Sequence, residues 1–143
     1  MIADRQELIE SSGSYVPLLV FPEGGTTNGS SLIKFKKGAF LTEKRCTPMV
    51  YKYDQDGSVS AAYDIIEILV LAILQLSWSC GKVKLLVLPD FEPTEYLFET
   101  HKDKGTERWE IYAWALREAM MKYGDLKPCD IPLRQKMIYE GYM

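Results

Sequence analysis

The chain has 143 residues, of which 47% are hydrophobic and 26% are charged, as is ordinary for a single globular domain. Its formal net charge of −3 leaves no broad basic surface to neutralise a nucleic-acid backbone, so nucleic acid is excluded as the expected partner. With one histidine and three widely separated cysteines there is no zinc-ligand set, and we expect free thiols and no metal site.

Taken in chain order, hydrophobic spacing and turn residues predict alternating helices and strands. The polar segment 2–11 is expected to be a short helix, and it has no apolar core of a secretory signal. The elements expected after it are strand 15–21, loop 22–35, helical turn 36–42, strand 46–53, helix 61–79, strand 82–88, loop 89–105 and helix 106–123. This alternation predicts an α/β fold with a mostly parallel sheet.

The most apolar stretch of the chain is residues 65–76, which read IIEILVLAILQL. The run is shorter than the roughly 20 residues that span a bilayer, and Glu67 and Gln75 interrupt it. We expect a helix buried against the sheet. A helix lying on a membrane surface is the second interpretation.

The helix expected at 106–123 is amphipathic, with Thr106 as its N-cap and Gly124 as its stop. Trp114 and Met121 fall outside its apolar stripe and are candidates for contact with a partner. The stripe itself, expected to face the core, comprises Trp109, Tyr112, Ala113, Leu116, Ala119, Met120 and Tyr123.

The last residues, 125–143, contain two prolines and show no periodicity. Such a segment buries little of its own surface, so we expect an extended tail that follows a domain of residues 1–124. We expect a neighbouring chain to hold this tail.

A glycine-bearing loop, residues 22–35, follows the first expected strand. Pro22 lacks a backbone donor and ends regular pairing, and the glycines after it allow successive N–H groups to point inward around an anion. Three lysines follow within a few residues, and lysine is a flexible point charge suited to phosphate. The loop is therefore a candidate phosphate site, although Glu23 would repel an anion unless a cation lies near it. The alternative is a surface turn followed by an exposed basic face.

This segment resembles the FPEG block of the glycerolipid acyltransferases. The resemblance is closest to the lysophosphatidylcholine-acyltransferase-like branch, and it rests on Phe21-Pro22-Glu23-Gly24, Thr26-Thr27-Asn28 and Lys34-Phe35-Lys36-Lys37-Gly38-Ala39-Phe40. It covers about residues 16–123 and begins in the middle of the family's domain, so it implies the C-terminal half of an acyltransferase-like α/β sandwich. The substrate-binding residues that it implies are Glu23, Gly24, Thr26, Thr27, Lys34, Lys36 and Lys37.

The family's catalytic motif, His-x-x-x-x-Asp, does not occur in this sequence. His101 is the single histidine, and Thr106 stands five positions after it. A general base contributes about 10²–10⁴-fold in rate. We therefore expect no catalytic residue and no activity of this chain alone. The resemblance implies acyl-CoA as the co-substrate of any acyl transfer, and no cofactor.

Two functions follow from the resemblance. In the first, the chain is the acceptor-binding part of a lysophospholipid acyltransferase whose His and Asp lie elsewhere. In the second, it is a non-catalytic structural or lipid-contacting subunit of a larger, membrane-bound complex. Both imply other protein chains as partners and contact with phospholipid, at an intracellular membrane such as the endoplasmic reticulum or the mitochondrion.

Overall fold

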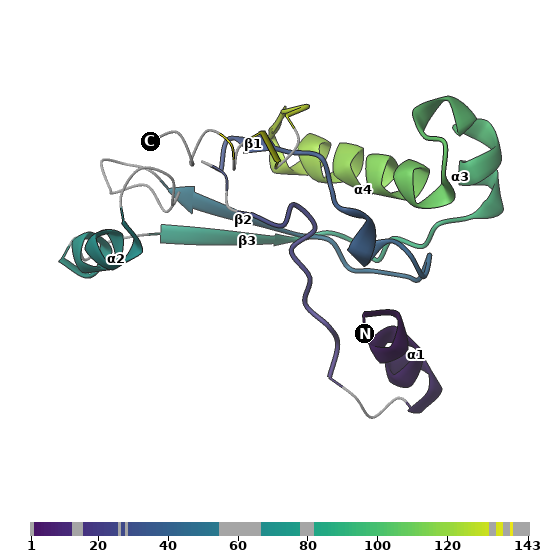
Figure 1. Ribbon diagram of the computed structural model, residues 1–143, viewed down its shortest axis with the longest axis horizontal. Coiled ribbons are helices and arrows are strands. Elements are labelled where there is room, and N and C mark those ends of the chain that lie inside the picture. The colour runs from purple at the N-terminus through teal and green to yellow at the C-terminus, as the bar shows by residue number, and fades with distance from the viewer. Residues whose placement is uncertain are drawn as a thin grey trace.

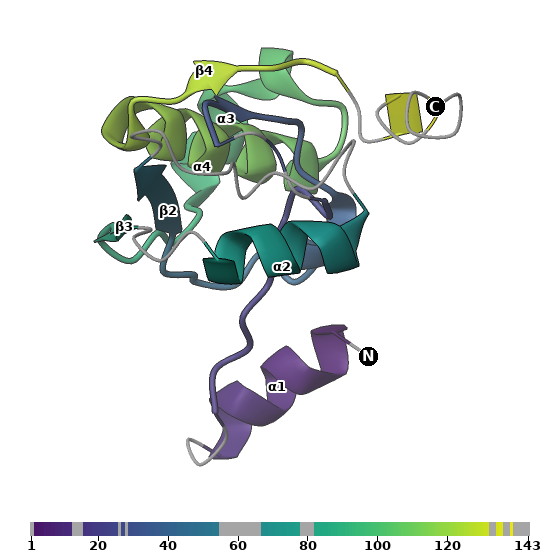
Figure 2. The same ribbon diagram turned by 90° about the vertical axis from the view of Figure 1, so that its left-hand side faces the viewer.

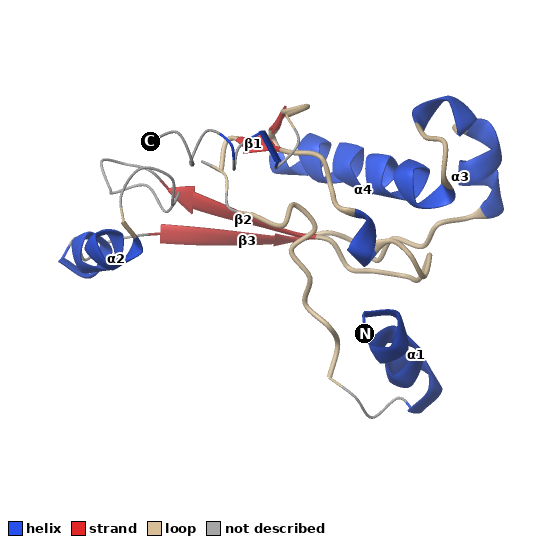
Figure 3. Ribbon diagram, in the orientation of Figure 1, coloured by secondary structure: helices blue, strands red, loops and turns tan. Residues whose placement is uncertain are grey.

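The computed structural model describes residues 2–12, 16–25, 27, 29–54, 67–77, 82–131, 134–135 and 138. Its elements combine helices with short strands, as Figures 1 and 3 show, and this confirms a mixed α/β composition. In chain order they are α1 (Ile2–Ser12), β1 (Ser31–Leu32), the 3-10 turn η1 (Lys37–Ala39), β2 (Met49–Asp54), α2 (Ile68–Ser77), β3 (Lys82–Val87), α3 (Glu95–Thr100), the 3-10 turn η2 (Lys102–Lys104), α4 (Arg108–Gly124) and β4 (Lys127–Pro128).

The described strands form two separate pairs, so the prediction of a mostly parallel sheet is wrong. β2 and β3 are antiparallel over six residues, with Met49 opposite Val87 at one end of the register. β1 and β4 are parallel over two residues, with Ser31 opposite Lys127. Periodicity along the chain identifies a strand, but strand direction depends on which segments meet in space. The long connection between β2 and β3 is compatible with either direction.

The strand predicted at 15–21 is wrong, because the described residues 16–21 form an irregular and largely exposed segment. Val16 is 77% exposed and Phe21 is 68% exposed. An apolar strand of this kind is stable when other elements cover both of its faces. None of the strands in the described part of the chain pairs with it.

One face of α4 forms the centre of the core, and α4 contacts β2 (Figure 1). Tyr112 and Phe40 are the most deeply buried large side chains, and their rings meet edge to face with 5.1 Å between centroids. Such a pair contributes about 0.5–1.5 kcal/mol beyond the burial of its area. The same cluster includes Leu32, Phe35, Val50, Leu88, Phe98, Ile111, Ala113, Leu116, Met120 and Met121.

The apolar stripe predicted for α4 is confirmed at its centre, where Tyr112, Ala113, Leu116 and Met120 are buried. It is wrong at its end, because Tyr123 is 62% exposed. Met121, which we expected to meet a partner, is buried in the core. Trp114 packs on His101 of the same chain, with 5.0 Å between the ring centroids.

The N-terminal boundaries of α3 and α4 are set by capping residues, and the N-cap of α4 lies next to the predicted one. The N-cap of α4 is Glu107 rather than Thr106, and Glu107 forms a capping box with Glu110. α3 lies within the segment predicted as a loop. Thr94 caps it by accepting a hydrogen bond from the Leu97 N–H at 3.3 Å.

α2 was expected to be buried, and this prediction is wrong. Among its described side chains Leu71 is the buried one, at 5% exposed, whereas Leu69 is 67% and Leu76 is 83% exposed. Figure 2 shows α2 lying beside the strand pair, farther from α4 than the strands are. In the described part of the chain, no helix combines the length and the apolar character needed to cross a membrane.

The first residues of the predicted tail, which we expected a neighbouring chain to hold, form hydrogen bonds within the chain itself. The Lys127 N–H donates to the Ser30 carbonyl at 3.0 Å, and the Cys129 N–H donates to the Leu32 carbonyl at 3.1 Å. These bonds place β4 beside β1, in the last part of the glycine-bearing loop. A segment about a hundred residues away in sequence thus supports the end of that loop.

Candidate functional site

Hydrogen bonds between its two ends close the glycine-bearing loop. The Lys36 N–H donates to the Pro22 carbonyl at 2.8 Å, and the Gly24 N–H donates to the Phe21 carbonyl at 3.1 Å. The bond from Gly24 closes a local turn, whereas the bond from Lys36 joins the ends of the loop. The Glu23 carboxylate adds a second link between the ends by accepting from the Ile33 N–H at 3.2 Å. The motif glutamate therefore fixes the shape of the loop by joining its start to its end.

The Lys36 side chain lies directly against Gly24. Gly24 has a φ of +71°, and a Cβ added there would stand 2.7 Å from both Cε and Nζ of Lys36. Glycine alone tolerates this backbone conformation together with so close a neighbour. An ammonium group thus lies beside the residue that follows Glu23, and the loop combines a cation with its carboxylate.

Two of the predicted binding residues, Thr27 and Lys34, are placed differently from Lys36. The Thr27 hydroxyl donates to the Ser31 carbonyl at 3.2 Å and accepts from the Gly29 N–H at 3.4 Å, so it shapes the turn. Lys34 is exposed. Thr26 lies outside the described residues.

Lys37 is directed toward the start of α4. Its ammonium forms an ion pair with Glu107 at 2.9 Å and lies 5.7 Å from the centroid of the Trp109 ring. The hydrogen bond from Lys37 lowers the pKa of the Glu107 carboxyl. The structure therefore brings Glu23, Gly24 and Lys36 together, and it pairs Lys37 with another element.

A buried arginine, Arg117, holds the end of the loop in place. Arg117 is 8% exposed, and its guanidinium donates to the Leu32 carbonyl at 2.8 and 3.3 Å and to the Cys129 carbonyl at 2.8 Å. It also donates to Asp130 at 3.2 Å. One side chain of α4 thus binds β1 and the segment that follows β4.

The sequence motifs do not include Arg117, but its position carries a signal. It lies four residues after Ala113 and three before Met120, and therefore on the apolar face of α4. A charged group at such a position is stable only with hydrogen-bond partners. Its place in the stripe could have marked it as a residue that binds backbone carbonyls.

Tyr112 of α4 and the half-buried Cys46 form a polar pair. The Tyr112 hydroxyl donates to the Lys44 carbonyl at 2.7 Å and lies 3.1 Å from the Cys46 sulfur. Burial raises the pKa of the Cys46 thiol, and burial also raises the pKa of Tyr112. A thiol with a raised pKa is a weak nucleophile at neutral pH, so Cys46 fits the predicted free, structural thiol.

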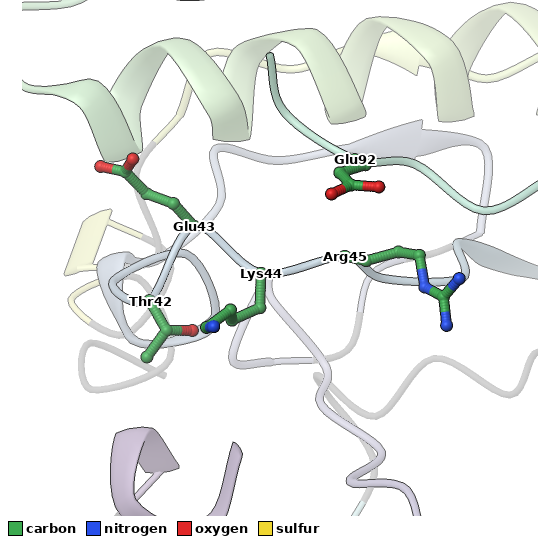
Figure 4. Close-up of a pocket in the computed structure, with 5 residues that line it drawn as sticks. All are labelled: Thr42, Glu43, Lys44, Arg45 and Glu92. Carbon is green, nitrogen blue, oxygen red and sulfur yellow. The ribbon is translucent and has the colours of Figure 1, made fainter. Parts of the chain in front are cut away.

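A shallow pocket of about 480 Å³ is lined by acidic, basic and hydroxyl side chains that do not all point toward one common centre (Figure 4). Glu43 points toward α4, where Arg108 binds it at 2.8 Å. The side chains of Lys44 and Arg45 point in different directions. The pocket is lined by Thr42, Glu43, Lys44, Arg45 and Glu92, and none of the described binding residues predicted above is among them.

Comparison with known proteins confirms the resemblance to lysophospholipid acyltransferases. The chain is 30% identical over 140 residues to a lysophospholipid acyltransferase of Arabidopsis thaliana, a match that covers 98% of this chain and 33% of the relative. It is 32% identical over 116 residues to lysophosphatidylcholine acyltransferase 1 of Danio rerio, covering 78% of this chain and 20% of the relative. It is 36% identical over 89 residues to lysophosphatidylcholine acyltransferase 2 of Rattus norvegicus, covering 59% and 16%.

The chain therefore spans about a third or less of the length of these relatives. No protein-family model matches it, and no solved structure matches it at a significant level.

Proposed function

We propose that this chain, a sequence relative of the lysophospholipid acyltransferases, binds the phosphate of a lysophospholipid acceptor through its glycine-bearing loop. The closed geometry of residues 22–36 is the observation that carries the proposal. Glu23 links the two ends of the loop, and Lys36 lies against Gly24. A loop of fixed shape with an adjacent ammonium group favours a compact anion such as a phosphate.

We propose no catalysis by this chain alone. The ring of His101 packs on Trp114, and its backbone N–H donates to the Leu97 carbonyl at the end of α3. Thr106 stands where a His-x-x-x-x-Asp motif starting at His101 would need its aspartate. Transfer of an acyl group from acyl-CoA by the family's general base would therefore require a His-x-x-x-x-Asp motif, which does not occur in this sequence.

A second candidate function is that of a non-catalytic, structural or lipid-contacting subunit of a complex at an intracellular membrane. The outer face of the β2–β3 pair favours it. Val50 faces α4, where a Cβ added at Gly124 would lie 3.3 Å from it, so the alternate residues of both strands face away from α4. This outer face is 38–52% exposed at every position and comprises Met49, Tyr51, Tyr53, Val83, Leu85 and Val87. A contiguous apolar face of this kind is typical of a surface that another protein covers.

The loop is tested by titrating the protein with glycerophosphocholine, a soluble form of the headgroup, in a calorimeter. We expect Lys36→Met and Gly24→Ala each to weaken binding by about fivefold or more, because each removes or displaces a charge-assisted contact. Lys122→Met, at an exposed lysine on α4, is the matched control. Lys37→Met then shows whether the lysine paired with Glu107 contributes as well. Unchanged affinity in both Lys36→Met and Gly24→Ala would contradict the proposal.

The absence of activity is tested separately with acyl-CoA and a lysophospholipid, by following the release of free coenzyme A thiol. We expect release no faster than in a sample without protein. Release that depends on this chain and on the lysophospholipid would refute the inactivity of the chain alone, while leaving the binding loop to be judged by the titration.

A further inference from the structure

The peptide unit between Leu32 and Ile33 has a charged side chain bound at each of its two polar groups. Its carbonyl oxygen accepts from the Arg117 guanidinium at 2.8 and 3.3 Å. Its N–H donates to the Glu23 carboxylate at 3.2 Å. The peptide bond is trans and therefore planar, with the carbonyl oxygen and the N–H pointing in opposite directions. A cation and an anion are thus connected through one rigid unit.

The polarity of this peptide unit matches the two charges. The negative carbonyl end faces the guanidinium and the positive N–H end faces the carboxylate, so each hydrogen bond is charge-assisted and polarises the other. Leu32 is 5% exposed and Ile33 is 6% exposed, so the peptide unit is shielded from water. Loss of the guanidinium at one end is therefore expected to weaken the bond that holds Glu23 at the other.

The other bonds of Arg117 also serve to place backbone. Its Nη2 atom donates to the Cys129 carbonyl at 2.8 Å as well as to Leu32, and its Nη1 atom donates to Asp130 at 3.2 Å. Asp130 is 76% exposed, so it is a weak counter-ion for a buried cation. The planar fork of an arginine is suited to several acceptors held in fixed directions. Arg117 therefore holds the Leu32 carbonyl from a fixed direction.

We propose that Arg117 is a positioning residue of the glycine-bearing loop, which acts through the Leu32–Ile33 peptide unit to hold the Glu23 carboxylate. With Glu23 bound to the Ile33 N–H, Gly24 and the adjacent Lys36 ammonium are left to receive the anion. A carboxylate released from Ile33 would repel that anion or compete with it for Lys36, and both effects weaken binding. The inference rests on the proposed function, because it assigns Arg117 a role in the affinity of the loop.

The first test is titration of the variants with glycerophosphocholine in a calorimeter. We expect Arg117→Met to weaken binding about tenfold, and Arg117→Lys to weaken it less, because lysine keeps the charge without the planar fork. The control is Phe98→Leu, which removes buried apolar contacts in α3, and Figure 1 shows α3 at the opposite end of α4 from β1. This control should bind as the wild type does.

Two results of the titration would overturn the proposal. One is unchanged affinity in Arg117→Met. The other is an equal loss of affinity in Phe98→Leu, because the effect of Arg117 would then be one of stability alone.

The second test asks whether Arg117 acts through Glu23. Arg117→Met is introduced into the wild type and into Glu23→Ala, and the affinity of each protein is measured. In the Glu23→Ala background we expect Arg117→Met to change the affinity by less than about twofold, because the carboxylate that Arg117 positions is absent. Losses that multiply in the double variant would show that the two residues act independently, and the proposal would fail.

The third test requires no ligand, and it measures amide hydrogen exchange by nuclear magnetic resonance. We expect Arg117→Met to accelerate exchange of the Ile33 N–H about tenfold more than that of the Ala113 N–H on the buried face of α4. Phe98→Leu should not accelerate Ile33 more than Ala113. Equal acceleration of Ile33 and Ala113 in Arg117→Met would overturn the positioning role. A wild type that does not bind glycerophosphocholine would instead refute the proposed function, and the exchange rates would still decide whether Arg117 positions the loop.

Discussion

Arg117 connects the candidate loop to the rest of the fold, and its replacement by methionine tests that connection. Methionine keeps the unbranched stem and the apolar packing of the side chain but removes the guanidinium. Four hydrogen bonds are lost, two of them to the Leu32 carbonyl, one to the Cys129 carbonyl and one to Asp130.

The expected cost follows from what each partner retains. The Leu32 carbonyl still accepts from the Cys129 N–H, so it keeps one partner. The part-buried Cys129 carbonyl loses its charged donor, and leaving such a group unsatisfied costs about 1–3 kcal/mol. Asp130 contributes little, because its carboxylate is 76% exposed. We therefore expect the free energy of unfolding to fall by about 2–3 kcal/mol.

The free energy is measured by urea denaturation followed by far-ultraviolet circular dichroism. Arg45→Met is the matched control, because Arg45 is 67% exposed and its ion pair with Asp90, at 3.6 Å, is at the surface. That variant should differ from the wild type by less than about 1 kcal/mol. If Arg117→Met were as stable as Arg45→Met, the inference that this guanidinium anchors β1 and β4 would be refuted.

Substitutions at three further positions address the loop, the capping box and the buried phenol. Glu23→Ala is expected to destabilise the protein by about 1 kcal/mol through loss of the bond to Ile33, and Glu23→Gln, which retains an acceptor, by less; equal losses in urea denaturation would count against a hydrogen-bonding role. Glu110→Ala removes bonds to the N–H groups of Thr106 and Glu107 and is expected to cost about 0.5–2 kcal/mol, with exposed Glu118→Ala as the comparison. The raised pKa of Tyr112 means that the fold favours the neutral phenol, so its contribution is full below pH of about 10 and is lost as the pH rises through the folded pKa. Tyr112→Phe should cost about 1 kcal/mol at neutral pH and flatten the loss of stability above pH of about 10, and an unchanged alkaline profile would assign that loss to other groups.

The sequence predicted best the elements whose own residues determine them. α1, β3 and α4 lie within a few residues of their predicted bounds, because amphipathic spacing and capping residues are local signals. The segment 16–21 has the composition of a buried strand, but no strand of the described chain pairs with it, so composition alone was misleading. The direction of β3 against β2 likewise depends on a contact between distant segments, which periodicity does not encode.

The same distinction applies to the candidate site. The motif identified Glu23, Gly24 and Lys36, which the structure brings together, because they lie in one short loop. It also grouped Lys37 with them, although adjacent residues can point to different elements and Lys37 pairs with Glu107. Arg117 is distant in sequence from the loop, and only the folded chain shows that it holds Leu32.

The parallel contact between β1 and β4 has a consequence for the order in which the molecule forms. During synthesis the ribosome releases residues 22–36 long before Lys127 and Cys129, so the motif segment emerges without the neighbours that later fix its end. Closing a chain of about a hundred residues is entropically costly and slow compared with forming a local turn. The geometry of the candidate loop is therefore expected to be among the last features that a newly made molecule acquires.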